Sequence, residues 1–379
     1  MPIAQQRLHR IAVSSFFFLA GICFASWASR IPDIQTKLQL NSAALGGILL
    51  CLPVGLVTSL PVAGFLVAKY GSRSVLIFAA ALYALTLPML GFAGSTSQLM
   101  ITLFVFGFGG NMMNISMNTQ AVGTEKLYTK PIMASFHGIW SLAGFTGAAV
   151  STGMVRFYII PPYHYICITS LALVILLIFS TKLLPQDSGQ NEKQPIFAKP
   201  DKSILNLGLI AFCSMICEGA MFDWSGIYFS KVVQPGAAWV TVGYTAFMST
   251  MATGRFVGDW VAHKLGMKKM LQASGILTAT GLLLAVIFPQ FITATIGFLL
   301  VGAGVSSVVP MIYSAAGKSK VMSPGLAIAA VSTIGYLGFL IGPPFIGFIA
   351  QATSLRISLG VIALMGAMIV LIAAKIKTI

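Results

Sequence analysis

Twelve long apolar segments, joined by short connections, fill almost the whole of this 379-residue chain. Hydrophobic residues make up 57% of the sequence and charged residues only 8%, whereas a soluble domain carries about a quarter charged residues. A helix that crosses a bilayer needs about 20 apolar residues. The sequence therefore predicts an all-α polytopic membrane protein with twelve transmembrane helices, the first at about 11–29 and the last at about 354–375. These twelve segments leave no room in the chain for a soluble catalytic domain of ordinary size.

Basic residues divide unevenly between the two sides of these segments. The even-numbered connections and the two ends carry 17 of the 23 lysines and arginines. The odd-numbered connections carry five: Arg30, Lys37, Arg156, Lys231 and Arg356. Because lysine and arginine are retained on the cytoplasmic side of a membrane, the bias predicts that both termini are cytoplasmic. The net charge of +15 is then explained by topology. We expect the basic residues to contact anionic lipid head groups, and we expect no binding to nucleic acid.

The two halves of the chain repeat weakly. Residues 107–109 (GFG) in the fourth span match residues 302–304 (GAG) in the tenth, at an offset of 195. The turn at 64–73 (GFLVAKYGSR) resembles the stretch 258–268 (GDWVAHKLGMK) at a corresponding place. These matches predict two pseudo-symmetric six-helix bundles, residues 1–184 and 204–379, with a cytoplasmic linker at 185–203. Parallel repeats of this kind are typical of transporters in which one half rocks against the other.

Several stretches resemble the major facilitator superfamily, and the resemblance extends over essentially the whole chain. The turn at 64–73 is similar to that family's loop between helices 2 and 3, with Ala68 where an aspartate is usual. More specific stretches are FASWASRIPDIQTKL (24–38), SFHGIWSLAG (135–144), EGAMFDWSGIY (218–228) and GYLGFLIGPPFIGF (335–348). They look like the bacterial inner-membrane YbjJ-type branch, which is distantly similar to the fucose permeases. The resemblance implies a permease that works by alternating access, and it supplies no substrate.

Glu218 is the first candidate for proton coupling. It lies about 22 Å along the seventh span, past the middle of a membrane and well short of its outer boundary, where an ionisable group is costly unless it is paired or faces water. A carboxyl group there can take up a proton in one conformation and release it in another. The alternative is a protonated or hydrogen-bonded acid that only packs helices. Substitution by glutamine would preserve packing and abolish coupling to pH.

Charged residues near the ends of spans suggest two gates, an outer one with Arg30 and Asp223 and an inner one with Arg255 and Asp259. Asp223 lies about 30 Å along the seventh span, and Arg30 occupies the matching depth on the first. Either these two pair across the halves as an outer gate, or Arg30 pairs with nearby Asp33 and Asp223 faces water. Arg255 and Asp259 share one face of the eighth span because they are four residues apart.

The family resemblance implies that Arg255 and Asp259 belong to an inner gate, with Lys69 and Arg73 in the corresponding N-terminal turn. The alternative is a local ion pair that only lowers the cost of burying Arg255. The gate is favoured because both charges lie at a position that is repeated in the other half.

Polar side chains in the fourth and fifth spans are candidates for substrate binding. Asn111, Asn114 and Asn118 form one stripe at helical spacing, and His137 and Ser141 lie at a similar depth. The family resemblance implies that helices 1, 4, 7 and 10 line a central cavity, where Asn114 and Asn118 would contact a polar substrate. Asparagine also serves as hydrogen-bonding glue between membrane helices, and that alternative stays open.

Aromatic residues complete the candidate substrate site. Trp27, Trp224 and Tyr313 could offer ring faces to a solute, although packing is the commoner fate of buried rings. His137 is a second candidate proton carrier, because free histidine titrates near neutral pH. No nucleotide, dinucleotide, metal or nucleophile motif occurs, so we expect no cofactor, no metal and no enzyme activity.

The sequence as a whole predicts a secondary active transporter of the bacterial inner membrane. It would move a small polar solute by alternating access, with coupling to protons through Glu218, and would act as a monomer. Efflux of a drug or metabolite by the same fold, or a substrate sensor that does not transport, are the alternatives.

Overall fold

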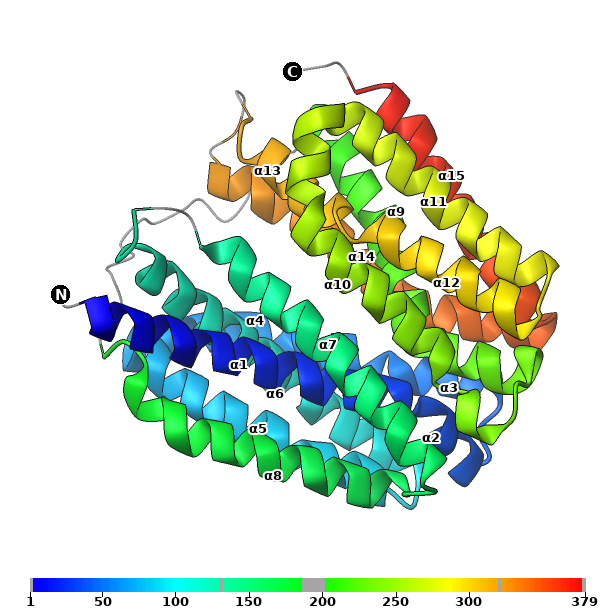
Figure 1. Cartoon of the computed structure of the whole chain (residues 1–379), viewed down its shortest axis with the longest axis horizontal. Helices are drawn as coiled ribbons and strands as arrows, with labels where there is room; N and C mark the ends of the chain where they lie inside the picture. Colours follow the sequence, from blue (N-terminus) through cyan, green and yellow to red (C-terminus); the bar gives the residue numbers. More distant parts are fainter. Residues whose placement is uncertain (1–2, 130–131, 186–201, 320–321, 323, 377–379) are drawn as a thin grey trace. The chain divides into compact units, whose positions relative to one another are not determined.

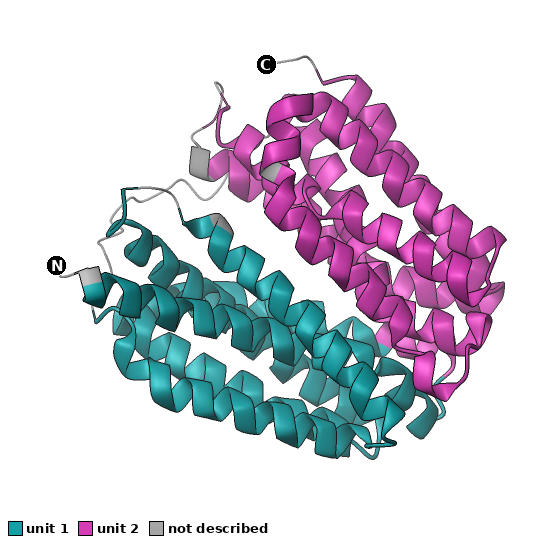
Figure 2. Ribbon diagram, in the orientation of Figure 1, with its two compact units in different colours: residues 1–40, 48–190 teal, residues 41–47, 191–379 magenta. Residues whose placement is uncertain are grey.

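The structure is a computed structural model, and helices form all the regular secondary structure that it describes. It describes residues 3–129, 132–185, 202–319, 322 and 324–376. The predicted linker at 185–203 therefore lies almost entirely outside the described residues. Within them the chain divides into two compact units, residues 1–40 with 48–190 and residues 41–47 with 191–379 (Figure 2).

Unit 1 is a bundle of long helices (Figure 1), and its helix α1 is largely buried. Its helices are α1 (Ile3–Ser29), α2 (Ile31–Lys37), α4 (Cys51–Tyr70), α5 (Ser72–Phe92), α6 (Thr96–Glu125), α7 (Met133–Arg156) and α8 (Pro161–Phe179). A short 3-10 turn, Ser180–Lys182, continues α8. Helix α3 (Ser42–Leu49) begins in unit 2 and ends in unit 1.

Unit 2 repeats this plan around the buried helix α9. Its helices are α9 (Lys202–Tyr228), α10 (Val242–Leu265), α11 (Met267–Ile287), α12 (Phe291–Val305), α13 (Val308–Ala316), α14 (Pro324–Ala352) and α15 (Leu355–Ala374). A π-helical turn, Phe229–Val233, extends α9, and a 3-10 turn, Ala237–Trp239, precedes α10.

The helices account for the twelve expected membrane spans. Ten helical segments of the described chain are long and apolar enough to cross a membrane, and the joined pairs α3–α4 (Ser42–Tyr70) and α12–α13 (Phe291–Ala316) each count as one. The other two spans are α7 and α10, of 24 residues each. Their length of about 36 Å exceeds the roughly 30 Å of a hydrocarbon core. The chain is an all-α polytopic membrane protein.

Two of the expected continuous spans are interrupted, each next to a proline. Helix α3 gives way to α4 at Leu50, and Pro53 lacks the N–H that would bond to the carbonyl of Leu49. Helix α12 gives way to α13 at Ser306 and Ser307, and Pro310 lacks the N–H that would bond to Ser306.

The glycines of the predicted repeat make the same kind of contact in each unit. A Cβ on Gly107 of α6 would collide with the carbonyl of Leu52 on α4. A Cβ on Gly302 of α12 would collide with the carbonyl of Phe247 on α10. The two backbones can approach this closely only because glycine has no side chain, as is common between membrane helices.

The two repeated turns are also alike. Gly71 ends α4 with a φ of 79°, and Gly266 ends α10 with a φ of 76°. This region of backbone space suits glycine because it lacks a Cβ. In both turns the glycine N–H bonds back to a carbonyl of the preceding helix, Val67 and Ala262 respectively.

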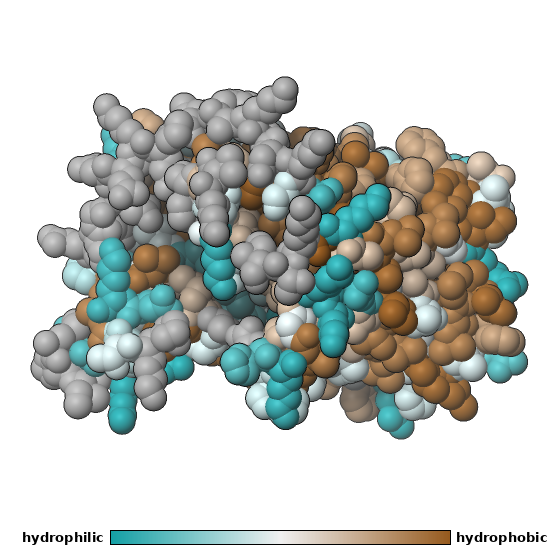
Figure 3. All heavy atoms as spheres, turned by 90° about the horizontal axis from the view of Figure 1, so that it is seen from above, coloured by the Kyte–Doolittle hydropathy of each residue, from teal (hydrophilic) through white to brown (hydrophobic). Residues whose placement is uncertain are grey.

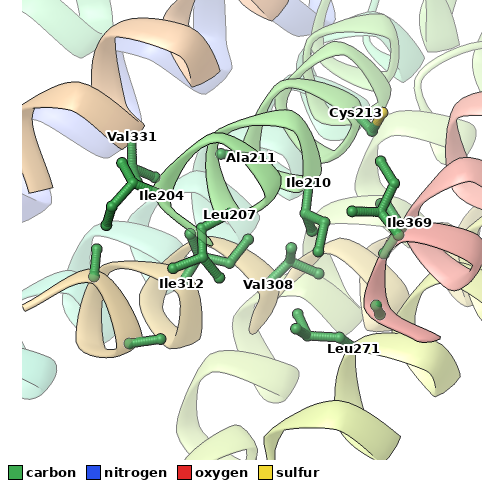
Figure 4. Packing of buried hydrophobic residues seen from close by; sticks show 14 of the residues in the cluster. Ile204, Leu207, Ile210, Ala211, Cys213, Leu271, Val308, Ile312, Val331 and Ile369 are labelled. Carbon is green, nitrogen blue, oxygen red and sulfur yellow. The ribbon is translucent and has the colours of Figure 1, made fainter. Parts of the chain in front are cut away.

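Apolar side chains both fill unit 2 and cover much of the surface. Residues at the start of α9 pack against apolar residues of α11, α13, α14 and α15 (Figure 4). The cluster includes Ile204, Leu207 and Ile210 of α9, Leu271 of α11, Val308 and Ile312 of α13, Val331 of α14 and Ile369 of α15. Large hydrophobic side chains such as Ile101 and Leu177 are exposed, at 67% and 72%. Hydrophobic residues dominate one side of the face shown in Figure 3. In a membrane such surface meets lipid tails, whereas in water it would promote aggregation.

Candidate functional site

A buried ion pair joins α9 to α10 in unit 2. Nη2 of Arg255 on α10 lies 3.3 Å from Oε1 of Glu218 on α9. The Glu218 side chain is 8% exposed and that of Arg255 is 19% exposed. Sequence reasoning selected both residues, but for different sites. The structure brings them together because α10 turns Arg255 toward α9.

Small residues fix the part of α10 that carries Arg255. Gly254 and Gly258, four residues apart on α10, pack against Ser306 and Ser307 at the break between α12 and α13. The Ser307 hydroxyl donates to the Gly254 carbonyl at 3.3 Å. The interruption next to Pro310 thus supplies a polar anchor for the neighbouring helix.

Three tyrosines of unit 2 lie within range of the charge of Glu218. The charge of Glu218 acts on the hydroxyls of Tyr244 on α10, Tyr313 on α13 and Tyr336 on α14. The Tyr313 hydroxyl forms a hydrogen bond with Ser332 on α14. Only Tyr313 was selected from the sequence. Tyr244 could have been found as well, because it precedes Arg255 by eleven residues, about three helical turns, and so lies on the same helix face.

Aromatic rings pack against two of these tyrosines, Tyr244 and Tyr336. The ring of Phe222 on α9 meets Tyr244 and Phe247 of α10 at centroid distances of 6.4 and 5.7 Å, both nearly edge-on. It stacks on Phe339 of α14 at 6.5 Å. Phe339 in turn lies 6.4 Å from Tyr336. Phe222 therefore ties α9, α10 and α14 together beside the ion pair.

Asp223 and Trp224 follow on the same helix. Asp223 is half-buried and has no ion pair or hydrogen bond to any residue that the structure describes. Trp224 is fully buried, and its indole N–H has no hydrogen-bond partner among those residues. A half-buried acid without a partner inside a membrane span is a candidate for function.

Arg30 in unit 1 pairs with Asp33, which is one of the two expected arrangements. Nε of Arg30 lies 3.1 Å from Oδ2 of Asp33, and Nη2 donates to the Ile159 carbonyl at 2.8 Å. Arg30 is 2% exposed. Burial raises the pKa of Asp33 above its usual value, although the Arg30 charge acts in the opposite direction. Arg30, which follows α1, thereby contacts both α2 and the segment that precedes α8.

The asparagine stripe of α6 divides between two tasks. Asn111 is buried, and its amide donates to the Leu56 carbonyl at 3.1 Å and to the Ser59 hydroxyl at 2.7 Å, both on α4. It therefore bridges two helices. The Asn118 amide donates to Oδ1 of Asn114 at 2.9 Å on its own helix.

The remaining unit 1 candidates lie on α7 and α1. His137 is exposed, and its ring meets Phe17 edge-on at 5.3 Å. Ser141 is buried, and its hydroxyl donates to the His137 carbonyl at 3.1 Å. Trp27 is buried, and its indole N–H has no hydrogen-bond partner in the described part of the chain. The sequence pattern placed His137 and Ser141 at a depth similar to that of the asparagine stripe, and the substrate contacts of all three residues stay predictions.

The turn after α4 keeps its basic residues at the surface. Lys69 is exposed, with Nζ 5.6 Å from the Phe65 ring centroid and 5.1 Å from that of Tyr70, and Arg73 is half-buried. The repeat continues in α10, where Lys264 lies 4.0 Å from the Trp260 ring centroid. The side chain of Asp259 lies outside the described residues, and so does its expected pairing with Arg255.

Another acid has a structural task. Oε2 of Glu125, at the end of α6, accepts hydrogen bonds from the backbone N–H groups of Ile132 and Met133, each at 2.7 Å. A carboxylate at the start of a helix satisfies free N–H groups and complements the helix dipole. Glu125 therefore stabilises the start of α7.

Comparisons with known proteins agree with this architecture. Residues 13–320 match the Major Facilitator Superfamily. The chain is 36% identical over 363 residues to an uncharacterised MFS-type transporter of Yersinia pestis, covering 96% of this chain and 93% of that one.

Solved structures show the same fold. A bacterial homologue of the human lysosomal transporter Spinster, in an inward-facing conformation, matches with a TM-score of 0.77 at 12% identity, over 99% of this chain and 98% of that one. The Escherichia coli fucose:proton symporter FucP matches with a TM-score of 0.60 at 18% identity, over 96% and 97% of the two chains.

The matched family and the Yersinia pestis relative are transporters, and the two bundles of long apolar helices are those of a multi-pass membrane protein, so the chain is a multi-pass membrane transporter. The chain belongs to the Major Facilitator Superfamily.

Proposed function

We propose that this protein is a secondary active transporter that moves a small polar solute by alternating access, coupled to protons through Glu218. The observation that carries the proposal is the ion pair of Glu218 with Arg255 inside the membrane-spanning part of unit 2. A buried pair of this kind contributes little net stability compared with apolar packing, so its presence favours a working role.

The pair offers two states that a proton can switch. When Glu218 is ionised, its carboxylate attracts the Arg255 guanidinium and holds α10 against α9. When Glu218 is protonated, that attraction is lost, and Arg255 keeps its charge because arginine is not deprotonated in proteins. A conformation in which Arg255 has another anionic or polar partner then becomes favourable. Such a charge exchange couples proton uptake to a change between conformations.

The surroundings of the pair suit a polar solute. Tyrosine hydroxyls both donate and accept hydrogen bonds, and the rings beside them offer flat apolar faces. Asn114 and Asn118 of α6 are the proposed contacts from unit 1. FucP, which shares the fold, is a fucose:proton symporter, and this supports proton coupling on this scaffold. We propose that residues 1–184 and 204–379 move as the two bodies of the cycle, with 185–203 as linker.

We also propose a bacterial inner-membrane location with both termini in the cytoplasm. The support is the distribution of lysine and arginine, including the matched turns at 69–73 and 264–269. Reporter fusions in these turns should report the cytoplasm. A reporter that finds either turn outside, or the two termini on different sides, would refute this topology.

A thermal-shift screen tests the central proposal. The purified protein is heated with sugars, sugar alcohols and common drugs at two pH values. We expect a hit whose affinity changes with pH in the native protein but not in Glu218→Gln. Glu125→Gln is the matched control, because glutamine can still accept the hydrogen bonds that cap α7.

Vesicle accumulation of the hit then separates transport from sensing. A proton-coupled transporter accumulates the solute, and an uncoupler abolishes the accumulation. A sensor binds without accumulating. Binding that changes equally with pH in native protein and in Glu218→Gln would overturn the assignment of Glu218.

A further inference from the structure

The loop that joins α7 to α8 carries the two most exposed aromatic side chains of the described chain. Tyr158 is 87% exposed and Phe157 is 76% exposed. Ile160 and Tyr163, which follow them, are exposed as well. Only residues 157–160 lie between the two membrane-spanning helices, so the loop stays close to the surface of the hydrocarbon core.

Tyr158 takes a backbone conformation that suits glycine. Its φ is 58°, in the left-handed region, which is unfavourable for a residue with a Cβ. Its N–H bonds to the Val155 carbonyl at 3.0 Å, and the N–H of Ile159 bonds to the Met154 carbonyl at 2.9 Å. This is the Schellman arrangement that ends many helices, and glycine usually occupies the place of Tyr158. A large exposed ring therefore stands where glycine would fit with less strain.

The loop is held from within unit 1. Nη2 of the buried Arg30 donates to the Ile159 carbonyl at 2.8 Å. Arg30 also pairs with Asp33, so one guanidinium joins the loop to α2. The end of α5 packs on the start of α8, where a Cβ on Gly91 would collide with Pro162. The loop thus presents its rings from a fixed base.

A second helix end has the same backbone geometry without an aromatic side chain. Gln39, after α2, has a φ of 51°. Its N–H bonds to the Thr36 carbonyl at 3.2 Å, and the N–H of Leu40 bonds to the Gln35 carbonyl at 3.0 Å. Gln39 is exposed and polar. The Schellman geometry by itself therefore does not require an aromatic residue.

The charges at this end of unit 1 suit phosphate groups. Arg156, directly before the loop, and Lys37 of α2 are both exposed. The charge of Asp33 is balanced by Arg30. Basic side chains attract anionic lipid head groups, and tyrosine collects at the level of the head groups because it combines an apolar ring with a hydroxyl.

We propose that the loop 157–160 anchors unit 1 in the head-group region of a phospholipid bilayer, with the Tyr158 ring as its main contact. The occupant of this surface is lipid, because the loop is short, basic residues lie beside it, and exposed apolar residues such as Ile166 continue from it along α8. Contact with lipid offsets the strain of the left-handed backbone. Under the proposed topology the anchor lies in the outer leaflet, and it does not depend on Glu218.

Fluorescence quenching by brominated phospholipids tests the anchor. Native protein, Tyr158→Trp and Gln39→Trp are each reconstituted in bilayers whose lipids carry bromine either near the head group or near the middle of the membrane. The signal of the five native tryptophans is subtracted. We expect bromine near the head group to quench the tryptophan at position 158 at least about twofold more than the one at position 39. Bromine near the middle should quench both weakly.

Glycine substitutions supply a second measurement. In a bilayer, Gln39→Gly should raise the melting temperature by about 1–3 °C, because it relieves the left-handed backbone and removes no lipid contact. Tyr158→Gly relieves the same kind of strain but also removes the ring, so we expect no rise. Circular dichroism before heating shows that each variant is folded.

Two results would overturn the anchor: equal quenching at positions 158 and 39, or an equal rise in melting temperature in both glycine variants. Tyr158→Trp that lipid bromine does not quench, in a particle with the mass of two chains, would show that a second copy covers the loop, and this too would refute the proposal. None of these measurements uses a solute or a proton gradient. The proposed function can therefore fail while the anchor stands, and the reverse.

Discussion

Arg255 and Glu218 lie 37 residues apart in the sequence, yet their charged atoms meet at 3.3 Å between α10 and α9. The two partners differ in one respect that matters for stability. A glutamate that loses its partner can become neutral by taking up a proton, whereas an arginine cannot lose its charge.

Replacing Glu218 and replacing Arg255 should therefore lower the free energy of unfolding by different amounts. Glu218→Gln removes one partner of the charged, largely buried Arg255 and should lower the free energy of unfolding by about 1.5–3 kcal/mol, as for a hydrogen bond to a charged group. Arg255→Gln should cost less, because Glu218 can protonate. The double variant should recover most of the loss. Thermal melting in detergent measures all three, and equal losses with no recovery would contradict this account.

Glycine at the contact of α6 with α4 should not tolerate a methyl group. Gly107→Ala places a Cβ against the Leu52 carbonyl, so the helices must separate, and the expected loss is about 1–3 kcal/mol. Gly302→Ala should behave alike against Phe247 in unit 2. The matched control is Gly64→Ala, whose added Cβ meets open space and should stabilise α4 by up to about 1 kcal/mol. Melting temperatures decide between these outcomes.

Asp33 should give the stability a recognisable dependence on pH. Its pKa is raised in the folded protein, mainly by burial, so the folded state binds a proton more tightly than the unfolded chain does. Between the ordinary aspartate value of about 3.9 and the raised folded value, stability should fall as the pH rises. Asp33→Asn should remove that slope. Melting curves at several pH values in this window test it, and an unchanged slope in the variant would exclude Asp33 as its source.

Two asparagines of one stripe should respond differently to alanine. Asn111→Ala removes two hydrogen bonds to α4 and leaves the Ser59 hydroxyl without that donor, so a loss of about 1 kcal/mol is expected. Asn118→Ala removes bonds within α6 only and should cost a few tenths of a kcal/mol. If Asn118 faces the solute, Asn118→Ala should weaken binding of a solute found in the screen more than Asn111→Ala does.

Much of the fold could be predicted from the sequence because membrane spans are long and uniform. Apolar length and basic residues marked twelve spans, and the structure has corresponding helices. The breaks at Leu50 and at Ser306 could not be predicted. Pro61 and Pro88 lie inside unbroken α4 and α5. Whether a proline interrupts a membrane helix depends on whether neighbouring groups satisfy the freed carbonyl, and this is a tertiary property.

The candidate site was only partly predictable for a related reason. Helical spacing reveals which residues share a face of one helix, so it suggested Arg255 with Asp259. It carries no information on how two helices are rotated against each other, and this rotation brings Arg255 to Glu218. Tyr244 was missed because a tyrosine in an apolar helix usually packs against its neighbours, although its spacing from Arg255 places both residues on one face of α10.

The meeting of Gly107 with the Leu52 carbonyl, and of Gly302 with that of Phe247, has a consequence for how such a protein can diversify. At these two helix contacts the backbones touch, so even the smallest side chain on the glycine collides with the facing carbonyl. Substitutions therefore cannot change the distance between the helices at these contacts, which we call seams, in small steps. New solute preferences in relatives of this chain must then arise at positions away from both seams, on a framework that is inherited unchanged.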